Sequence, residues 1–179
     1  MMEKYIRVKD HGTVLEISYE DMIKYHGRLN IGGVALAFKA LELGLAKLLP
    51  AGDIPERNKI GFASALGDSA TGVLDAVEMA TRAGSLGSLS ADIAFGRDID
   101  APANPDGGKF YFELTYDGAK VGLALKAGVI PDAFTGLLRI ALSRHLTSGE
   151  LHQLQEVKEE IAATVMSIEA EDLFNFHSF

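Results

Sequence analysis

Hydrophobic and polar positions follow the period of β-strands in the second half of the chain. Apolar side chains recur at every second position over residues 110–116 and again over residues 121–125, with Asp117-Gly118 between the two runs. An Asp-Gly pair between two alternating runs is typical of a tight hairpin turn. These residues therefore predict an antiparallel hairpin with one strongly apolar face.

Two earlier stretches predict elements inside the core. Residues 31–49 are apolar around most of a helical circumference and rich in Gly and Ala, which is typical of a buried helix. Residues 59–66 form an apolar run that predicts a buried strand near the centre of a sheet. We also expect short strands at residues 13–18 and 91–95.

Capping residues indicate where two shorter helices begin. Ser18 precedes a helix expected over residues 19–25, because Ser accepts a hydrogen bond from the free backbone N–H groups of a first turn. A second helix is expected over residues 73–82. Asp68 or Ser69 is its expected cap, since both lie in the turn that leads into it.

The C-terminal third predicts a pair of helices. Thr147 and Glu150 have the spacing of a capping box before a stretch whose apolar residues recur at helical spacing. The first helix of the pair opens at Pro131-Asp132. The apolar residues that we expect this first helix to bury are Phe134, Leu137, Leu138, Ala141 and Leu142.

Together these elements predict an α+β fold, with a mixed or antiparallel sheet, a central helix of small residues and a C-terminal helical pair. A chain of 179 residues that is 47% hydrophobic is long enough to bury one substantial core, so we expect a single domain over residues 1–179. Three phenylalanines in the tail, residues 170–179, are costly to leave in water. We expect the tail to dock, or to be exchanged between the two chains of a homodimer.

Composition excludes several classes of partner and of chemistry. The net charge is −8, from 17 basic and 25 acidic residues, and no basic cluster interleaves with aromatic residues, so we expect no nucleic-acid partner. The first residues lack an apolar signal core and charged residues interrupt the longest apolar helix, which predicts a cytoplasmic protein without a membrane partner. The chain has no cysteine, so any metal must use His, carboxylate, amide or water ligands.

The strongest candidate site centres on His26, which lies in a glycine-containing loop before the small-residue helix. A helix start carries partial positive charge and unpaired N–H groups, which favour a neutral imidazole and an anion beside it. His26 is therefore the candidate ligand of a divalent metal ion, with Asn30, Asp68 and water as further oxygen donors. The alternative is a buried histidine that bonds only to the backbone.

Other candidate residues have simpler structural explanations beside the functional ones. Asp68 and Ser69 are expected helix caps, and a second role in the pocket is the alternative. Arg97 follows Phe95-Gly96 at an expected strand end, where a guanidinium group can hold a carboxylate or a phosphate. A solvated arginine at the start of a loop is the alternative interpretation.

Several short motifs resemble those of the E-type accessory family of formylmethanofuran dehydrogenase, in the same order and over nearly the whole chain. They are Tyr25-His26-Gly27 before the small-residue helix, Gly72-Val73-Leu74-Asp75-Ala76-Val77, Phe95-Gly96-Arg97, Leu146-Thr147-Ser148-Gly149-Glu150-Leu151, and Glu171-Asp172-Leu173-Phe174. The resemblance implies a dimeric α+β domain with a cleft near the His-Gly segment and an accessory role.

The chain departs from that family at its cysteines. Asn30, Gly72 and Ala83 stand approximately where relatives have thiols, and the zinc module of many relatives is not part of these 179 residues. If those thiols carry the family's chemistry, this chain lacks it. The resemblance therefore favours a binding role.

Three functions remain open from the sequence. The first is an accessory or binding protein with a cleft around His26 and the two helix starts for a divalent metal or a small anionic ligand. The second is an enzyme of one-carbon-related metabolism, with His26 as metal ligand or general base and Arg97 orienting an acidic substrate. The third is a structural component of an assembly.

Overall fold

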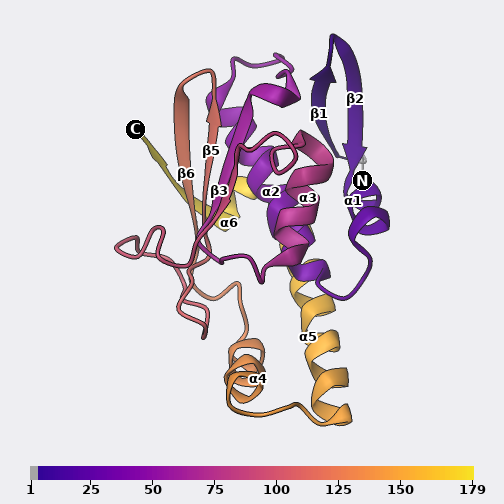
Figure 1. The fold of residues 1–179 in the computed structure, drawn as a ribbon, viewed down its shortest axis with the longest axis vertical. Helices are drawn as coiled ribbons and strands as arrows, with labels where there is room; N and C mark the ends of the chain where they lie inside the picture. Colours follow the sequence, from indigo (N-terminus) through magenta and orange to yellow (C-terminus); the bar gives the residue numbers. More distant parts are fainter. Residues whose placement is uncertain (1–3) are drawn as a thin grey trace.

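The computed structural model describes residues 4–179, and its fold is α+β (Figure 1). A five-stranded mixed sheet has the strand order β4-β3-β5-β6-β7, in which only the β3–β4 pair is parallel. The strands are β3 (Ile60–Ser64), β4 (Leu89–Ala91), β5 (Tyr111–Tyr116), β6 (Ala119–Leu125) and β7 (Phe174–Ser178). The predicted hairpin is β5–β6. The strand predicted near the centre of the sheet is β3, which is buried but lies second in the order, between β4 and β5.

A separate antiparallel ribbon precedes the first helix. Strands β1 (Tyr5–Asp10) and β2 (Thr13–Ser18) pair along their whole length. Strand β1 was not predicted from the sequence. Helix α1 (Tyr19–His26) follows directly, and the Ser18 side chain closes a capping box with Asp21. The predicted cap of α1 is therefore confirmed.

Helix α2 (Ile31–Leu48) occupies the centre of the molecule, as the small-residue pattern predicted. It packs on β5 and β6 on one side and on α3 (Thr71–Thr81) and α5 (Ser148–Ser167) on others. A Cβ atom on Gly44 would lie 2.6 Å from a Leu114 methyl carbon of β5. The absence of a side chain there lets the helix lie directly on the sheet.

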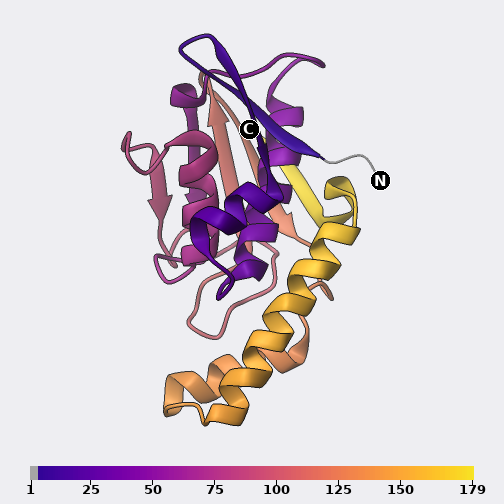
Figure 2. The same cartoon turned by 90° about the vertical axis from the view of Figure 1, so that its right-hand side faces the viewer.

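The predicted C-terminal helical pair forms an arm that extends beyond the sheet (Figure 2). Helix α4 (Asp132–Ser143) packs on α5, and Thr147 caps α5 with the expected capping box. The expected burial of the α4 face is wrong: Leu137 is buried, but Phe134 and Leu138 are only half-buried, and Ala141 and Leu142 are exposed. The cause is that α4 projects past the body, so only part of its apolar face meets other elements.

The loop after β4 covers part of the sheet face that points away from α2. The strand expected over residues 91–95 is wrong, because β4 ends at Ala91 and turns follow. The Asp92 carboxylate accepts a hydrogen bond from the Ala94 N–H at 2.8 Å, which bends the chain there. Phe95 then packs on the Tyr111 ring, with 5.6 Å between the ring centroids.

The tail docks on its own sheet. Helix α6 (Ala170–Leu173) leads into β7, which pairs with β6. Phe174 is buried, whereas Phe176 and Phe179 are exposed.

A short 3₁₀ turn, η1 (Arg57–Lys59), precedes β3. Within residues 4–179, no helix combines the length and the apolar character that a bilayer span requires.

Candidate functional site

A cavity of about 320 Å³ opens beside the first turns of α2 and α3. Helices α4 and α5 and the loop before β5 form its other walls. Most of its lining is apolar, and the side chains that contribute include Leu36, Leu66, Val73, Phe110, Phe134 and Leu138. The predicted pair of helix starts therefore borders one common hollow.

The two helix starts touch each other because glycines face the contact. A Cβ atom on Gly72 would lie 2.3 Å from the backbone oxygen of Asn30, and one on Gly33 would lie 3.1 Å from the backbone nitrogen of Val73. Two helix N-termini, each with partial positive charge, thus lie side by side at the cavity.

One cationic side chain lies at the cavity wall. Lys158 of α5 is half-buried and donates a hydrogen bond to Asn30 Oδ1 at 2.7 Å. Asn30 Nδ2 in turn donates to Thr71 Oγ1 at 2.8 Å. Burial lowers the pKa of the Lys158 ammonium group, because a low-dielectric surrounding disfavours its charged form. Helices α2, α3 and α5 are joined here by one polar chain.

Lys158 was not predicted from the sequence, although a signal for it exists. It lies within a strongly acidic segment, between the buried Val157 and Ile161 of the same helix. This position places it at the edge of the apolar stripe of α5 rather than on the solvated face. A lone lysine at such an edge is a candidate for a partly buried role.

The lining of the cavity also includes an acidic group. Asp106 lines it together with Asn104, and the Asp106 carboxylate accepts a hydrogen bond from the Gly108 N–H at 3.0 Å. Among the described lining residues, Lys158 is the only basic one and Asp106 the only acidic one. The formal charges of the lining therefore balance.

The structure brings Asn30 and Ser69 to the cavity, but not Asp68 or Arg97. Neither Asp68 nor Ser69 caps α3, because the N-cap position is Ala70, one residue after Ser69, and no side chain caps the helix there. That expectation is therefore wrong. Arg97 is exposed, and it lies in a turn rather than at a strand end because β4 stops at Ala91.

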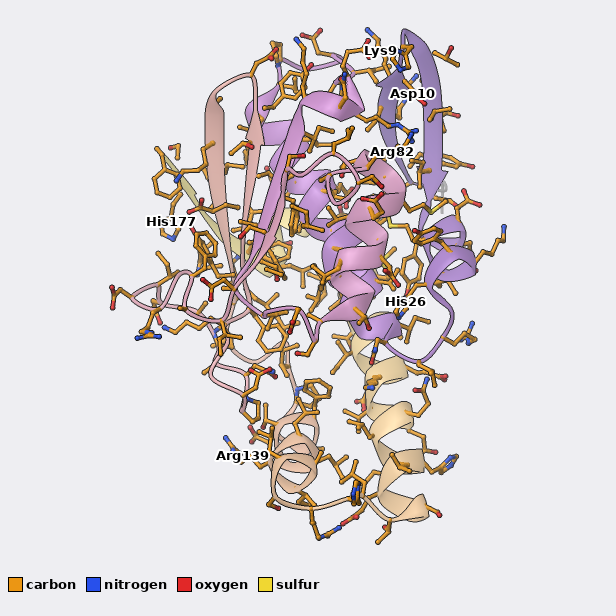
Figure 3. The ribbon with its side chains drawn as sticks, viewed as in Figure 1. Lys9, Asp10, His26, Arg82, Arg139 and His177 are labelled. Carbon is orange, nitrogen blue, oxygen red and sulfur yellow. The ribbon has the colours of Figure 1, made fainter. Side chains whose placement is uncertain are left out.

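His26 lies outside the cavity lining, where α1 ends beside the lower part of α3 (Figure 3). Its side chain is 7% exposed, and Nδ1 lies 2.7 Å from Asp75 Oδ2. Its Nε2 atom is buried and has no hydrogen-bond partner among the described residues. When Nδ1–H donates to Asp75, Nε2 holds a free lone pair.

A free imidazole nitrogen backed by a carboxylate is suited to a metal ion, because a carboxylate that accepts from the other ring nitrogen fixes the ring and its tautomer. A metal centre needs more ligands than this. Over residues 4–179 the structure holds no group of three or more His, Asp or Glu side chains that is arranged for a metal. The metal ion at His26 stays a prediction.

No protein-family model matches this chain, and no curated protein matches it at a significant level. The resemblance to the E-type accessory family of formylmethanofuran dehydrogenase therefore stays a prediction.

Proposed function

We propose that this chain is a ligand-binding protein that takes a small anionic molecule into the cavity beside Lys158. The observation that carries the proposal is the half-buried ammonium group of Lys158 at the wall of a mostly apolar cavity. Burial of a cation is unfavourable unless an opposite charge accompanies it, and within residues 4–179 Lys158 is hydrogen-bonded to Asn30 and forms no ion pair with Asp106 or another carboxylate. A bound anion supplies that charge, and the adjoining starts of α2 and α3 add favourable partial charge.

The test is the effect of Lys158→Met on the binding of a small carboxylate. With butanoate as the probe, we expect the variant to bind at least about tenfold more weakly, which corresponds to about 1.4 kcal/mol. Amide chemical shifts followed by NMR during a titration measure the dissociation constant and show whether Gly32, Gly33 and Gly72, which line the cavity, respond. Methionine keeps an unbranched apolar side chain, so the cavity wall stays filled.

The matched control is Lys24→Met, which removes an exposed lysine of α1 that lies outside the cavity lining. It should leave butanoate binding unchanged. In the natural protein the affinity should fall as the pH rises through the lowered pKa of Lys158, because the ammonium group then loses its charge. Equal binding by the natural protein and Lys158→Met would contradict the proposal.

We propose further that two chains associate through the arm of α4 and α5, as the expected homodimer. The support is apolar exposure: Leu142 is 63% exposed and Leu151 is 56% exposed, and both lie on this arm. Light scattering at about 100 μM should give the mass of two chains. The double variant Leu142→Lys with Leu151→Lys should give the mass of one, and a natural protein that is monomeric at this concentration would contradict the dimer.

The other sequence-based functions receive less support. The enzyme alternative depends on His26, whose pairing with Asp75 resembles the arrangement that orients a general base. His26 does not line the cavity, so we propose no reaction. The cytoplasmic location and the accessory role stay predictions.

A further inference from the structure

The walls of the cavity differ in chemistry, and this difference indicates what kind of anion fits. Helix α4 contributes only apolar side chains to the lining, Phe134, Leu138, Ala141 and Leu142. The wall formed by α5 and the start of α2 carries Lys158 and Asn30. A ligand held between them meets a cation on one side and an apolar surface on the other.

We infer that the ligand is an amphipathic monocarboxylate, whose carboxylate pairs with Lys158 and whose apolar chain or ring packs on α4. This inference rests on the proposed function, because it assigns the body of the same anionic ligand. The apolar surface of α4 supports it, because Phe134 and Leu138 line the cavity and are only half-buried. An apolar ligand body removes this surface from water, which is favourable in proportion to its area.

Size and charge argue against larger and more highly charged ligands. A volume of about 320 Å³ lies at the small end of ligand pockets, which range over about 300–1,000 Å³. Lys158 is the only basic lining residue within residues 4–179, and the acidic Asp106 is in the same lining, so a polyphosphate leaves most of its charge uncompensated in an apolar surrounding. A compact acid with a single negative charge satisfies both limits.

The experiment measures affinity along a homologous series from acetate through butanoate and hexanoate to octanoate. We expect the affinity to rise by up to about fourfold for each methylene group, until the cavity is filled. Octanol serves as the neutral partner of octanoate and should bind at least about tenfold more weakly. In Lys158→Met this preference for the acid over the alcohol should disappear, while the dependence on chain length remains.

Variants of α4 test the apolar wall separately. Leu138→Ala should reduce the gain from acetate to octanoate severalfold and leave acetate binding unchanged. Phe134→Ala, which truncates a second half-buried side chain of the same wall, should have the same effect. Circular dichroism establishes that each variant is folded, and an octanoate affinity equal to that of the natural protein in both folded variants would overturn the inference.

The remaining outcomes separate this inference from the proposed function. Acetate and octanoate binding equally, with both sensitive to Lys158→Met, would overturn the amphipathic ligand and retain the anion site. Octanol binding as tightly as octanoate, with no effect of Lys158→Met, would instead overturn the anion site itself. ATP binding more tightly than octanoate would overturn the inference, as would carboxylates that fail to bind because a second copy of the chain fills the cavity.

Discussion

Replacing Gly72 by alanine is expected to lower the free energy of unfolding by about 3 kcal/mol, a large effect for one methyl group. The added Cβ atom would lie 2.3 Å from the backbone oxygen of Asn30 and 3.2 Å from the backbone nitrogen of Val34. Both atoms belong to the start of α2 and cannot rotate away, so the methyl group must push α2 and α3 apart. Urea denaturation followed by circular dichroism measures the loss.

Gly136→Ala is the matched control, because a Cβ atom at this position of α4 meets nothing within 4 Å. Alanine favours a helix over glycine by about 1 kcal/mol, so this variant should be as stable as the natural protein or more so. An unchanged denaturation midpoint for Gly72→Ala would show that the starts of α2 and α3 are not in contact. If the alanine separates the starts of α2 and α3, butanoate binding should weaken as well, because Asn30 at the start of α2 accepts the hydrogen bond of Lys158.

Replacing Phe112 by alanine is expected to cost about 3–5 kcal/mol, the range for removal of a buried aromatic ring. Phe112 of β5 is fully buried, and its ring lies 5.7 Å from that of Phe62 in β3 and 6.3 Å from that of Phe174 in β7. The ring therefore fills space between strands that come from distant parts of the sequence. Thermal unfolding should show a correspondingly lower midpoint.

The control for Phe112 is Phe179→Ala, which removes an aromatic ring that is 70% exposed. Phe179 lies under the Lys120 ammonium group, 3.9 Å from the ring centroid, and such an exposed cation–π contact contributes about 0.5–1 kcal/mol. A loss for Phe112→Ala no larger than that for Phe179→Ala would show that Phe112 is not part of the packed core.

The parts of the fold that follow from local pattern were predicted well. The hairpin β5–β6 has a strict alternation with Asp117-Gly118 between its runs, and Ser18 and Thr147 cap the helices they were expected to cap. Strand β1 was missed, because its alternation consists of little more than Ile6 and Val8. The exposure of α4 was missed as well, since its apolar stripe does not reveal what it packs against.

The candidate site was predicted only as far as it depends on the two helix starts. The hydrogen bond between Lys158 and Asn30 joins residues 128 positions apart, and no local pattern specifies such a pairing. His26 was expected at the cavity, but its ring turns to Asp75 because α1 packs against α3. The direction of a side chain depends on tertiary packing, which periodicity does not encode.

The position of β7 at the end of the sheet affects how the protein is made. During synthesis, β6 and the apolar face around Phe112 exist long before residues 174–178 leave the ribosome. Over that interval β6 presents a bare edge with unpaired N–H and C=O groups, which favours pairing with other chains. A nascent polypeptide that stalls in α5 would therefore be prone to aggregation, and chaperones that cover apolar surfaces should bind it until the last strand is added.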